Sequence, residues 1–210
     1  MRAPSGDTPT QPDAGSGVVV PIRAFADGMA RLAEVLTPDQ RATLGRELAE
    51  RVLAAAAGYA TVVVTSAPEV RAWADAHRVP TIADPGSLDS AAAAGVAWCA
   101  AHGLARAIVL HADLPRVTSA SVDALARDGG APVAAIAPCR RGDGTPALSI
   151  PAASAASFAF AYGPGSYRRH TAAARAAGLG VRAVRDVALA ADLDLPEDLE
   201  AEGLVPSSPS

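Results

Sequence analysis

Lysine is absent from this sequence of 210 residues, because all 18 basic side chains are arginines. A site that needs a basic group must therefore use arginine, whose planar guanidinium is not equivalent to an ammonium group. Aromatic residues make up only 4% of the chain, although 50% of its residues are hydrophobic. The core must then consist of alanine, valine, leucine and isoleucine, and the length suits one compact α/β domain.

Charge and cysteine are also scarce, and this excludes several classes of function. The net charge is −4 and no basic run is present, which argues against binding to nucleic acid. The two cysteines, Cys99 and Cys139, are far apart and match no metal-binding spacing. No apolar run approaches the ~20 residues that span a bilayer, and no signal peptide is recognisable. We therefore expect a cytoplasmic protein with no membrane partner.

The two ends of the chain differ in composition from the part between them. Residues 1–17 are rich in Pro, Gly, Ser, Thr and Asp and lack an apolar core, so we expect a disordered leader. Residues 204–210 are expected to form a flexible tail. Residues 18–203 are expected to fold as a single domain.

Within that domain, short apolar runs alternate with helical patterns. The expected strands are residues 18–22, 60–65, 81–83, 107–110, 133–136, 147–150 and 181–184. The expected helices are residues 37–57, 66–77, 89–102, 118–127 and 166–177. The alternation predicts an α/β fold with a mostly parallel sheet flanked by helices. From Gly142 onward it weakens, which we interpret as an insertion that packs on the same sheet.

Polar residues that follow the expected strands are candidates for a site. Ligands of open α/β sheets bind outside the carboxyl ends of the strands, where the pattern places Arg23, Ser66, Asp84 and Asp113. Asp113 is a candidate magnesium ligand, since magnesium prefers hard oxygen donors. Alternatively, Asp113 only caps the turn before Pro115.

A second pair of carboxylates, Asp192 and Asp194, forms a D-x-D motif near the C-terminus. In an extended segment both side chains point to one face, so that they can share a cation with Asp113. The alternative is that Asp194 caps a helix that begins at Pro196, a common role for aspartate.

Two glycine-rich loops are suited to phosphate. Residues 142–145 offer backbone amides and the hydroxyl of Thr145, and residues 163–166 lead directly into a helix whose first amides can bind an anion. Arg169 follows closely. The alternative is an ordinary turn in which Ser166 caps the helix.

Taken in order, these motifs resemble those of the 2-phospho-L-lactate guanylyltransferase family, which includes enzymes that prefer phosphoenolpyruvate and acts in the synthesis of the deazaflavin coenzyme F420. The motifs are VPIR at 20–23, ARLA at 30–33, LTPDQR at 36–41, VTSAPEV at 64–70, DPG at 84–86, ADLP at 112–115, GT at 144–145, YGPGS at 162–166 and DLDLPEDL at 192–199. Each motif alone is weak, whereas the ordered set is fairly specific and extends over nearly all of residues 18–199.

The resemblance implies a single-domain nucleotidyltransferase with a Rossmann-like, GT-A-like fold. It implies transfer of GMP from GTP to a small phosphorylated acid (2-phospholactate, phosphoenolpyruvate or 3-phosphoglycerate) by a monomer or homodimer. The implied magnesium ligands are Asp113, Asp192 and Asp194. The implied nucleotide-binding residues are Pro21, Arg23, Arg31, Ser66, Asp84, Leu88 and Asp89. The implied ligands of the acceptor's phosphate are Thr145, Gly163, Ser166 and Arg169.

Three positions on the nucleotide side depart from the family pattern. The family usually has lysines where this chain has Arg23 and Met29, and an asparagine where it has Asp89. Met29 carries no charge, and Asp89 adds a negative charge beside the expected triphosphate. These departures leave two alternatives open: an inactive nucleotide-binding paralogue, or a nucleotidyltransferase with a different nucleotide donor.

Overall fold

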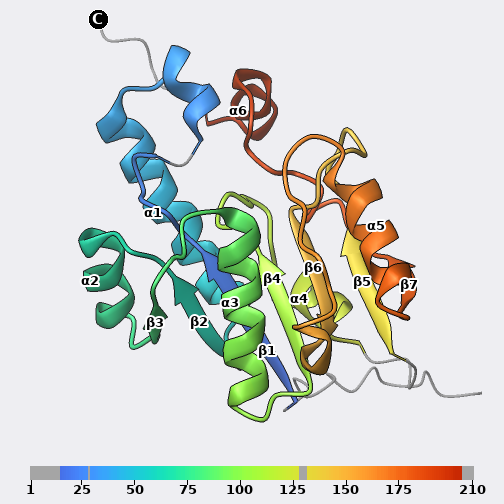
Figure 1. Ribbon diagram of the computed structural model, residues 1–210. Coiled ribbons are helices and arrows are strands. Elements are labelled where there is room, and N and C mark those ends of the chain that lie inside the picture. The colour runs from blue at the N-terminus through green and yellow to red at the C-terminus, as the bar shows by residue number, and fades with distance from the viewer. Residues whose placement is uncertain (1–14, 28, 128–131, 205–210) are drawn as a thin grey trace, which may run out of the picture.

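The computed structural model describes residues 15–27, 29–127 and 132–204, which form one α/β layer structure (Figure 1). The strands are β1 (Ser16–Pro21), β2 (Ala60–Val64), β3 (Thr81–Ile82), β4 (Arg106–Leu110), β5 (Val133–Ala137), β6 (Ala147–Pro151) and β7 (Gly180–Ala183). The helices are α1 (Pro38–Ala55), α2 (Pro68–Ala76), α3 (Leu88–Ala101), α4 (Ser119–Ala126), α5 (Ser166–Ala176) and α6 (Pro196–Glu202), with short 3-10 helices η1 (Ala30–Glu34) and η2 (Ala152–Ser154).

The strands form one sheet in the order β3-β2-β1-β4-β6-β5-β7. All pairs are parallel except the two that involve β6, which is antiparallel to β4 and to β5. The connection from β5 to β6 is too short to hold a crossover helix, so the chain must return in the opposite direction. The predicted α/β fold with a mostly parallel sheet is confirmed, and β6 and β7 extend the same sheet, as expected for the insertion.

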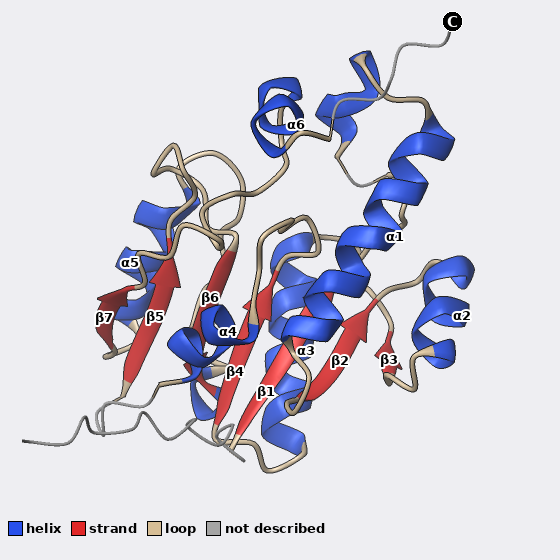
Figure 2. Ribbon diagram, turned by 180° about the vertical axis from the view of Figure 1, so that it is seen from behind, coloured by secondary structure: helices blue, strands red, loops and turns tan. Residues whose placement is uncertain are grey.

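Alternating side chains of β1 explain how the sheet is covered on both faces. Val18 and Val20 are buried in a cluster with α1, α2 and α4, whereas Val19 faces a second cluster with α3 and α5. Figure 2 shows α1, α2 and α4 on one face of the sheet, with α3 behind it. The backbone of α3 approaches β1 so closely that a Cβ on Gly95 would lie 2.0 Å from Val19 Cγ1, which only glycine allows.

A third apolar cluster lies beyond the carboxyl ends of the strands. It joins η1, α1 and α6 through the buried side chains of Leu32, Leu36, Leu48, Leu193 and Leu199. This cluster anchors the C-terminal segment beside the first half of the chain, although the two are far apart in sequence.

Several boundaries differ from those expected. Ser16 and Gly17 belong to β1 and pair with β4, so the expectation of a leader over residues 1–17 is wrong at its end, while residues 1–14 lie outside the described residues. Leu204 packs on the third apolar cluster, and residues 205–210 again lie outside the described part. Ser66 does not cap α2, because the N-cap is Ala67.

No helix in the described part of the chain has both the length and the apolar character needed to cross a membrane.

Candidate active site

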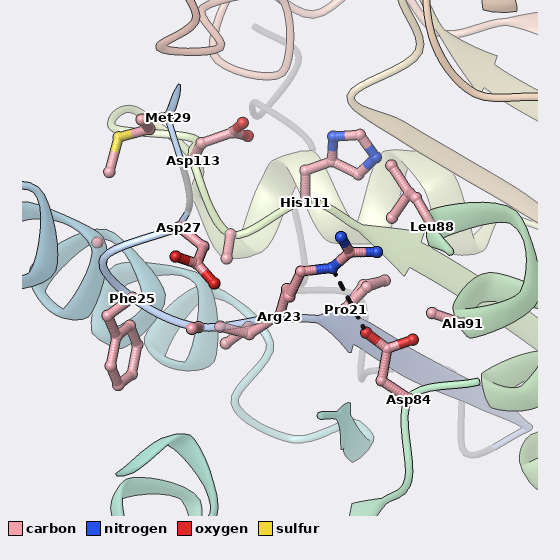
Figure 3. Close-up of a pocket in the computed structure, with 14 residues that line it drawn as sticks. Pro21, Arg23, Phe25, Asp27, Met29, Asp84, Leu88, Ala91, His111 and Asp113 are labelled. Carbon is pink, nitrogen blue, oxygen red and sulfur yellow. Dashed lines mark ion pairs between the residues drawn. The ribbon is translucent and has the colours of Figure 1, made fainter. Parts of the chain in front are cut away.

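Two adjoining cavities open at the carboxyl ends of the neighbouring strands β1 and β4. After β1 the chain continues to β2 on one side, and after β4 it continues to β5 on the other side, so the strand order reverses between them. The first, which we call the β1 cavity, has a volume of about 330 Å³. It is lined by Pro21, Ile22, Arg23, Ala24, Phe25, Asp27, Met29, Gly45, Asp84, Leu88, Ala91, His111, Ala112 and Asp113 (Figure 3).

The second, which we call the α5 cavity, has a volume of about 300 Å³. It is lined by Arg31, Leu88, His111, Asp113, Cys139, Arg141, Asp143, Gly144, Thr145, Pro146, Tyr162, Gly163, Pro164, Ser166, Asp192 and Asp194. Leu88, His111 and Asp113 line both cavities. The residues after β4 therefore form the boundary between two neighbouring binding spaces.

The charged groups of the β1 cavity are partly engaged by the protein itself. Arg23 is directed toward Asp84 (Figure 3), with its Nε 4.0 Å from a carboxylate oxygen, and its Nη2 donates to Gly86 O at 2.7 Å. Met29 has a left-handed backbone, with φ 56°, at the start of η1. An uncharged side chain therefore faces this cavity where the family pattern has a lysine.

The boundary between the cavities carries two buried polar side chains. Neither Asp113 Oδ1 nor His111 Nε2 has a hydrogen-bond partner among the described residues. Burial raises the pKa of Asp113 to about 7, with a smaller contribution from the charges of Asp194 and Asp198. Burial lowers the pKa of His111 to about 4. A capping role for Asp113 Oδ1 would need a backbone donor, and the described residues supply none.

The D-x-D segment lies directly beside Asp113. The amide of Leu193 donates to Asp113 O at 3.1 Å, and the Leu193 side chain is buried in the third apolar cluster. The flanking Asp192 and Asp194 are only half-buried and both line the α5 cavity, as the two-residue period predicts. The pKa of Asp192 is raised to about 6, mainly by burial and to a smaller extent by the charge of Asp113.

Asp194 is held by two arginines. Its Oδ2 accepts a hydrogen bond from Arg31 and another from Arg141 at 3.5 Å. Within the described residues, no three His, Cys, Asp or Glu side chains form a group spaced to hold a metal ion. Asp113, Asp192 and Asp194 therefore share a cavity, but Asp194 is turned toward the arginines.

The cap of α6 comes from Asp198 rather than from Asp194. Asp198 is buried, and its Oδ2 accepts the amides of Asp194 at 3.1 Å and Leu195 at 2.8 Å. The N-cap position is Leu195, so the interpretation of Asp194 as a helix cap is wrong. The physical reason is that Leu195, directly before the first helical residue, occupies the N-cap, and Asp198, the third helical residue, accepts the amides of Asp194 and Leu195. The Asp194 carboxylate is then left toward the cavity.

The loop before α5 forms the far wall of the α5 cavity. Gly163 and Gly165 have left-handed backbones, with φ of 96° and 76°, which allow the tight turn into α5. Gly165 is the N-cap, so Ser166 does not cap the helix. Ser166 Oγ instead donates to Thr145 Oγ1 at 3.2 Å. The two predicted phosphate loops are thereby joined.

Three predicted site residues line neither cavity. Ser66 Oγ donates to the backbone carbonyl of Asp84 and accepts its amide. Asp89 Oδ1 accepts the amide of Tyr162 at 2.7 Å, and the Arg169 guanidinium donates to the carbonyls of Ala161, Tyr162 and Pro164. These side chains hold the loops in place. Arg31, predicted on the nucleotide side, lines the α5 cavity instead.

Residues that sequence reasoning did not assign also line the site. His111 follows β4 immediately, and its place at a strand end was the available signal. Arg141 precedes the first glycine-rich loop and pairs with Asp194 and Asp198. Cys139 had no such signal. Its Sγ accepts the amide of Gly144 and donates to Asp143, which shapes the loop.

Comparisons with known proteins identify the family of this chain. The family described as "Guanylyl transferase CofC like" matches residues 16–204. A phosphoenolpyruvate guanylyltransferase from Sphaerobacter thermophilus is 35% identical over 187 residues, which cover 87% of this chain and 89% of the relative. A 2-phospho-L-lactate guanylyltransferase from Halorubrum lacusprofundi is 36% identical over 173 residues, which cover 81% and 76% of the two chains.

Solved structures show the same fold. A putative nucleotide-diphospho-sugar transferase from Desulfovibrio desulfuricans G20 superposes with a TM-score of 0.73 over 90% of this chain and 87% of its own, at 18% identity. The chain therefore belongs to the CofC-like guanylyltransferase family and has a nucleotidyltransferase fold.

Proposed function

We propose that this member of the guanylyltransferase family is magnesium-dependent and transfers GMP from GTP to the phosphate of a small phosphorylated acid. The acceptor is phosphoenolpyruvate, 2-phospholactate or 3-phosphoglycerate, and pyrophosphate is released. A product of this kind fits a step in the synthesis of coenzyme F420. The names of the relatives from Sphaerobacter and Halorubrum support the first two acceptors.

The observation that carries the proposal is the meeting of two cavities at Asp113. The β1 cavity is lined mainly by the segment that follows β1 and by the start of α3, and it combines apolar groups with Arg23, Asp27 and Asp84, a lining that suits a nucleotide. The α5 cavity holds hydroxyls, the turn at Gly163 and two arginines, which suit a phosphorylated acid, beside carboxylates that suit a cation. Two substrates bound in these cavities would meet at the shared boundary.

The reaction requires alignment rather than a general base. A phosphate monoester is largely ionised near neutral pH, so an oxygen of the acceptor's phosphate can attack the α-phosphorus directly. A bond forms between that oxygen and the α-phosphorus while the bond between the α-phosphorus and the bridging oxygen of the β-phosphate breaks. The electron pair leaves with pyrophosphate. In this proposal Arg31 and Arg141 neutralise developing negative charge in the α5 cavity.

In this proposal the three carboxylates that line the α5 cavity hold a magnesium ion once Asp194 has left its arginines, because as they lie they are not grouped to hold one. Asp113, Asp192 and Asp194 supply hard oxygen donors, and Asp113 Oδ1 is buried without a partner among the described residues. The charge of Asp113 raises the pKa of Asp192, and the charges of Asp194 and Asp198 raise that of Asp113, so a cation bound here would relieve repulsion between carboxylates. When bound, magnesium supplies charge neutralisation and a template for the phosphates. Asp194 would exchange its arginine partners for that role.

Pyrophosphate release tests the proposal directly. The purified protein is incubated with GTP, magnesium and each of the three acceptors, and product is identified by mass spectrometry. We expect release that depends on both magnesium and one acceptor. Release that is equal without any acceptor, or no release with any of the three, would contradict the proposal.

A second candidate function follows from Met29, which faces the β1 cavity where the family pattern has a lysine. In this view the protein binds nucleotide without catalysis, or uses a donor other than GTP. A thermal-shift panel with GTP, ATP, CTP and UTP separates these cases from the first. Stabilisation by another nucleotide, with turnover, identifies a different donor, and binding without turnover identifies an inactive member.

A further inference from the structure

Three buried polar side chains form a connected group behind the α5 cavity. His170 of α5 is 0% exposed, Thr145 before β6 is 3% exposed and Ser166 at the start of α5 is 1% exposed. Thr145 and Ser166 line the cavity, whereas His170 does not. His170 can therefore influence a bound ligand only through its neighbours.

The hydrogen bonds of His170 determine where its proton lies. The amide of Ala161 donates to Nε2 at 2.9 Å, and a backbone amide can only donate. Nε2 therefore carries no proton, and the single proton of the neutral ring lies on Nδ1. Nδ1 is 3.1 Å from Thr145 Oγ1 and so donates to it. Burial lowers the pKa of His170 to about 4, which keeps the ring neutral near pH 7.

The surroundings of His170 maintain this arrangement. The rings of Phe158, Phe160 and Tyr162 lie 6.0, 6.3 and 4.7 Å from the imidazole, centroid to centroid. The nearest charged side chains are otherwise engaged: Asp89 accepts the amide of Tyr162, and Arg169 donates to loop carbonyls. The electrostatic influence of Asp89 raises the pKa of His170, while His111 and Arg169 lower it. No charged group competes for either ring nitrogen among the described residues.

The consequence for Thr145 follows from counting its lone pairs. Thr145 Oγ1 accepts one hydrogen bond from His170 Nδ1 and a second from Ser166 Oγ at 3.2 Å. A hydroxyl has two lone pairs and one proton, so both acceptor positions are filled. Among the described residues no acceptor takes the remaining proton. Since Thr145 lines the α5 cavity, its hydroxyl can act there only as a donor.

We propose that His170 is a positioning residue that holds the Thr145 hydroxyl as a hydrogen-bond donor toward the α5 cavity. This position then selects an oxygen that only accepts, such as an ionised phosphate oxygen, over a hydroxyl that must donate. The identity of the ligand rests on the proposed function. The direction of the Thr145 proton does not.

Substitution of His170 tests the relay through the two Michaelis constants. His170→Phe keeps a ring but removes both nitrogens, so Thr145 is free to turn its proton away from the ligand. We expect the KM for the acceptor to rise about 10-fold, which corresponds to one hydrogen bond to a charged group. The KM for GTP should stay unchanged, because no nucleotide-side residue depends on His170. His170→Asn, whose amide can donate to Thr145 Oγ1, should recover part of the loss.

A double-mutant cycle distinguishes this role from a merely structural one. In a Thr145→Val background, His170→Phe should cause no further rise in the acceptor KM, because the hydroxyl that it positions is gone. Independent, additive effects of the two substitutions would overturn the inference. Equal effects on the KM values for GTP and acceptor would also overturn it, since they indicate general loss of structure.

The tautomer can be measured on the unmodified protein, which covers the case in which His170→Phe does not fold. Long-range proton–nitrogen NMR correlations of the imidazole should show a protonated Nδ1 and an unprotonated Nε2 at pH 7. The opposite tautomer, or a charged ring, would overturn the inference. If the protein transfers GMP to none of the acceptors, the proposed function fails, whereas the tautomer and the binding of inorganic phosphate to wild type and variants still test His170.

Discussion

The two cavities that meet at Asp113 differ in how their polar groups are held. In the α5 cavity, Thr145 and Ser166 are connected to a buried histidine, and the loop that leads to Ser166 is held by Arg169 and Asp89. In the β1 cavity, the single arginine, Arg23, is bound to a loop carbonyl and directed toward Asp84.

The difference shows which half of the site is already arranged for its ligand. Groups whose rotamers are fixed by a second layer of hydrogen bonds lose little entropy when a ligand binds. The two hydroxyls of the acceptor side have this second layer, whereas Arg23 must leave Gly86 to reach a phosphate, as Arg31 must leave Asp194. We therefore expect substitutions on the two sides to separate cleanly in their kinetic effects.

The largest effect is expected from Asp113→Asn, because Asp113 belongs to both cavities. We expect kcat to fall about 100-fold or more, as for loss of a group that binds a catalytic metal or orients charge. The melting temperature should not fall, since the change removes a buried carboxylate whose pKa burial has raised. Asp123→Asn, at a residue that accepts a hydrogen bond from Tyr59 outside both cavities, is the control. Full activity of the Asp113 variant would refute the boundary role.

The next prediction concerns how the free energy of unfolding depends on pH, and it tests whether His170, on the α5 side, is buried in its neutral form. Because the pKa of His170 is lowered from 6.5 to about 4, the unfolded chain binds a proton in this window that the folded protein excludes. The contribution of His170 to the free energy of unfolding should therefore be fully retained above pH 6.5 and fall as the pH drops toward 4, whereas Asp113 and Asp192, whose pKa values are raised, act in the opposite direction. The slope from this group is at most about 1.4 kcal/mol per pH unit.

Urea unfolding at pH 7 and pH 5 measures this slope. His170→Phe should unfold with a smaller difference between the two pH values than the wild type. An equal difference in both proteins would show that His170 is not held neutral by burial. Substitution of His102, which is exposed at the end of α3, is the control for loss of a histidine elsewhere.

Thr145→Val should affect only the acceptor side. We expect the KM for the acceptor to rise about 10-fold, because a donor to a charged oxygen is lost. The KM for GTP should not change. Thr171→Val, which removes a hydroxyl that donates to Tyr167 O within α5, controls for general loss of threonine. A rise in both KM values would mean that the cavities are not separate binding spaces.

The smallest effect is expected on the nucleotide side, from Met29→Lys. A lysine at this position would place a cation in the β1 cavity and lower the KM for GTP about 3-fold, as for a partly exposed ion pair. The acceptor KM should stay constant. Met29→Leu keeps the shape without the charge and should leave both values unchanged. If Met29→Lys instead weakens GTP binding, the cavity is adapted to another donor.

Much of the fold was predictable because it depends on local patterns. The alternation of valine-rich runs with helical patterns predicted the α/β sheet, and α1 begins where its pattern does, with Thr37 as the N-cap of a capping box. The D-x-D period predicted that Asp192 and Asp194 share a face, and the burial of Leu193 between them confirms it. The assignment of Asp194 as a cap failed because the N-cap of α6 is Leu195, one residue later, and Asp198 of the first helical turn accepts the amides of Asp194 and Leu195.

Local patterns of residues specify the strands, the helices between them and the position of Asp113 at a strand end, because each follows from periodicity within a few residues. Which loops meet across the carboxyl edge of the sheet depends instead on the packing of the whole domain. Contacts such as His170 with Thr145 and Arg31 with Asp194 join residues that are distant in sequence. Their direction depends on how the sheet and the third apolar cluster orient each loop, and no local pattern carries that information.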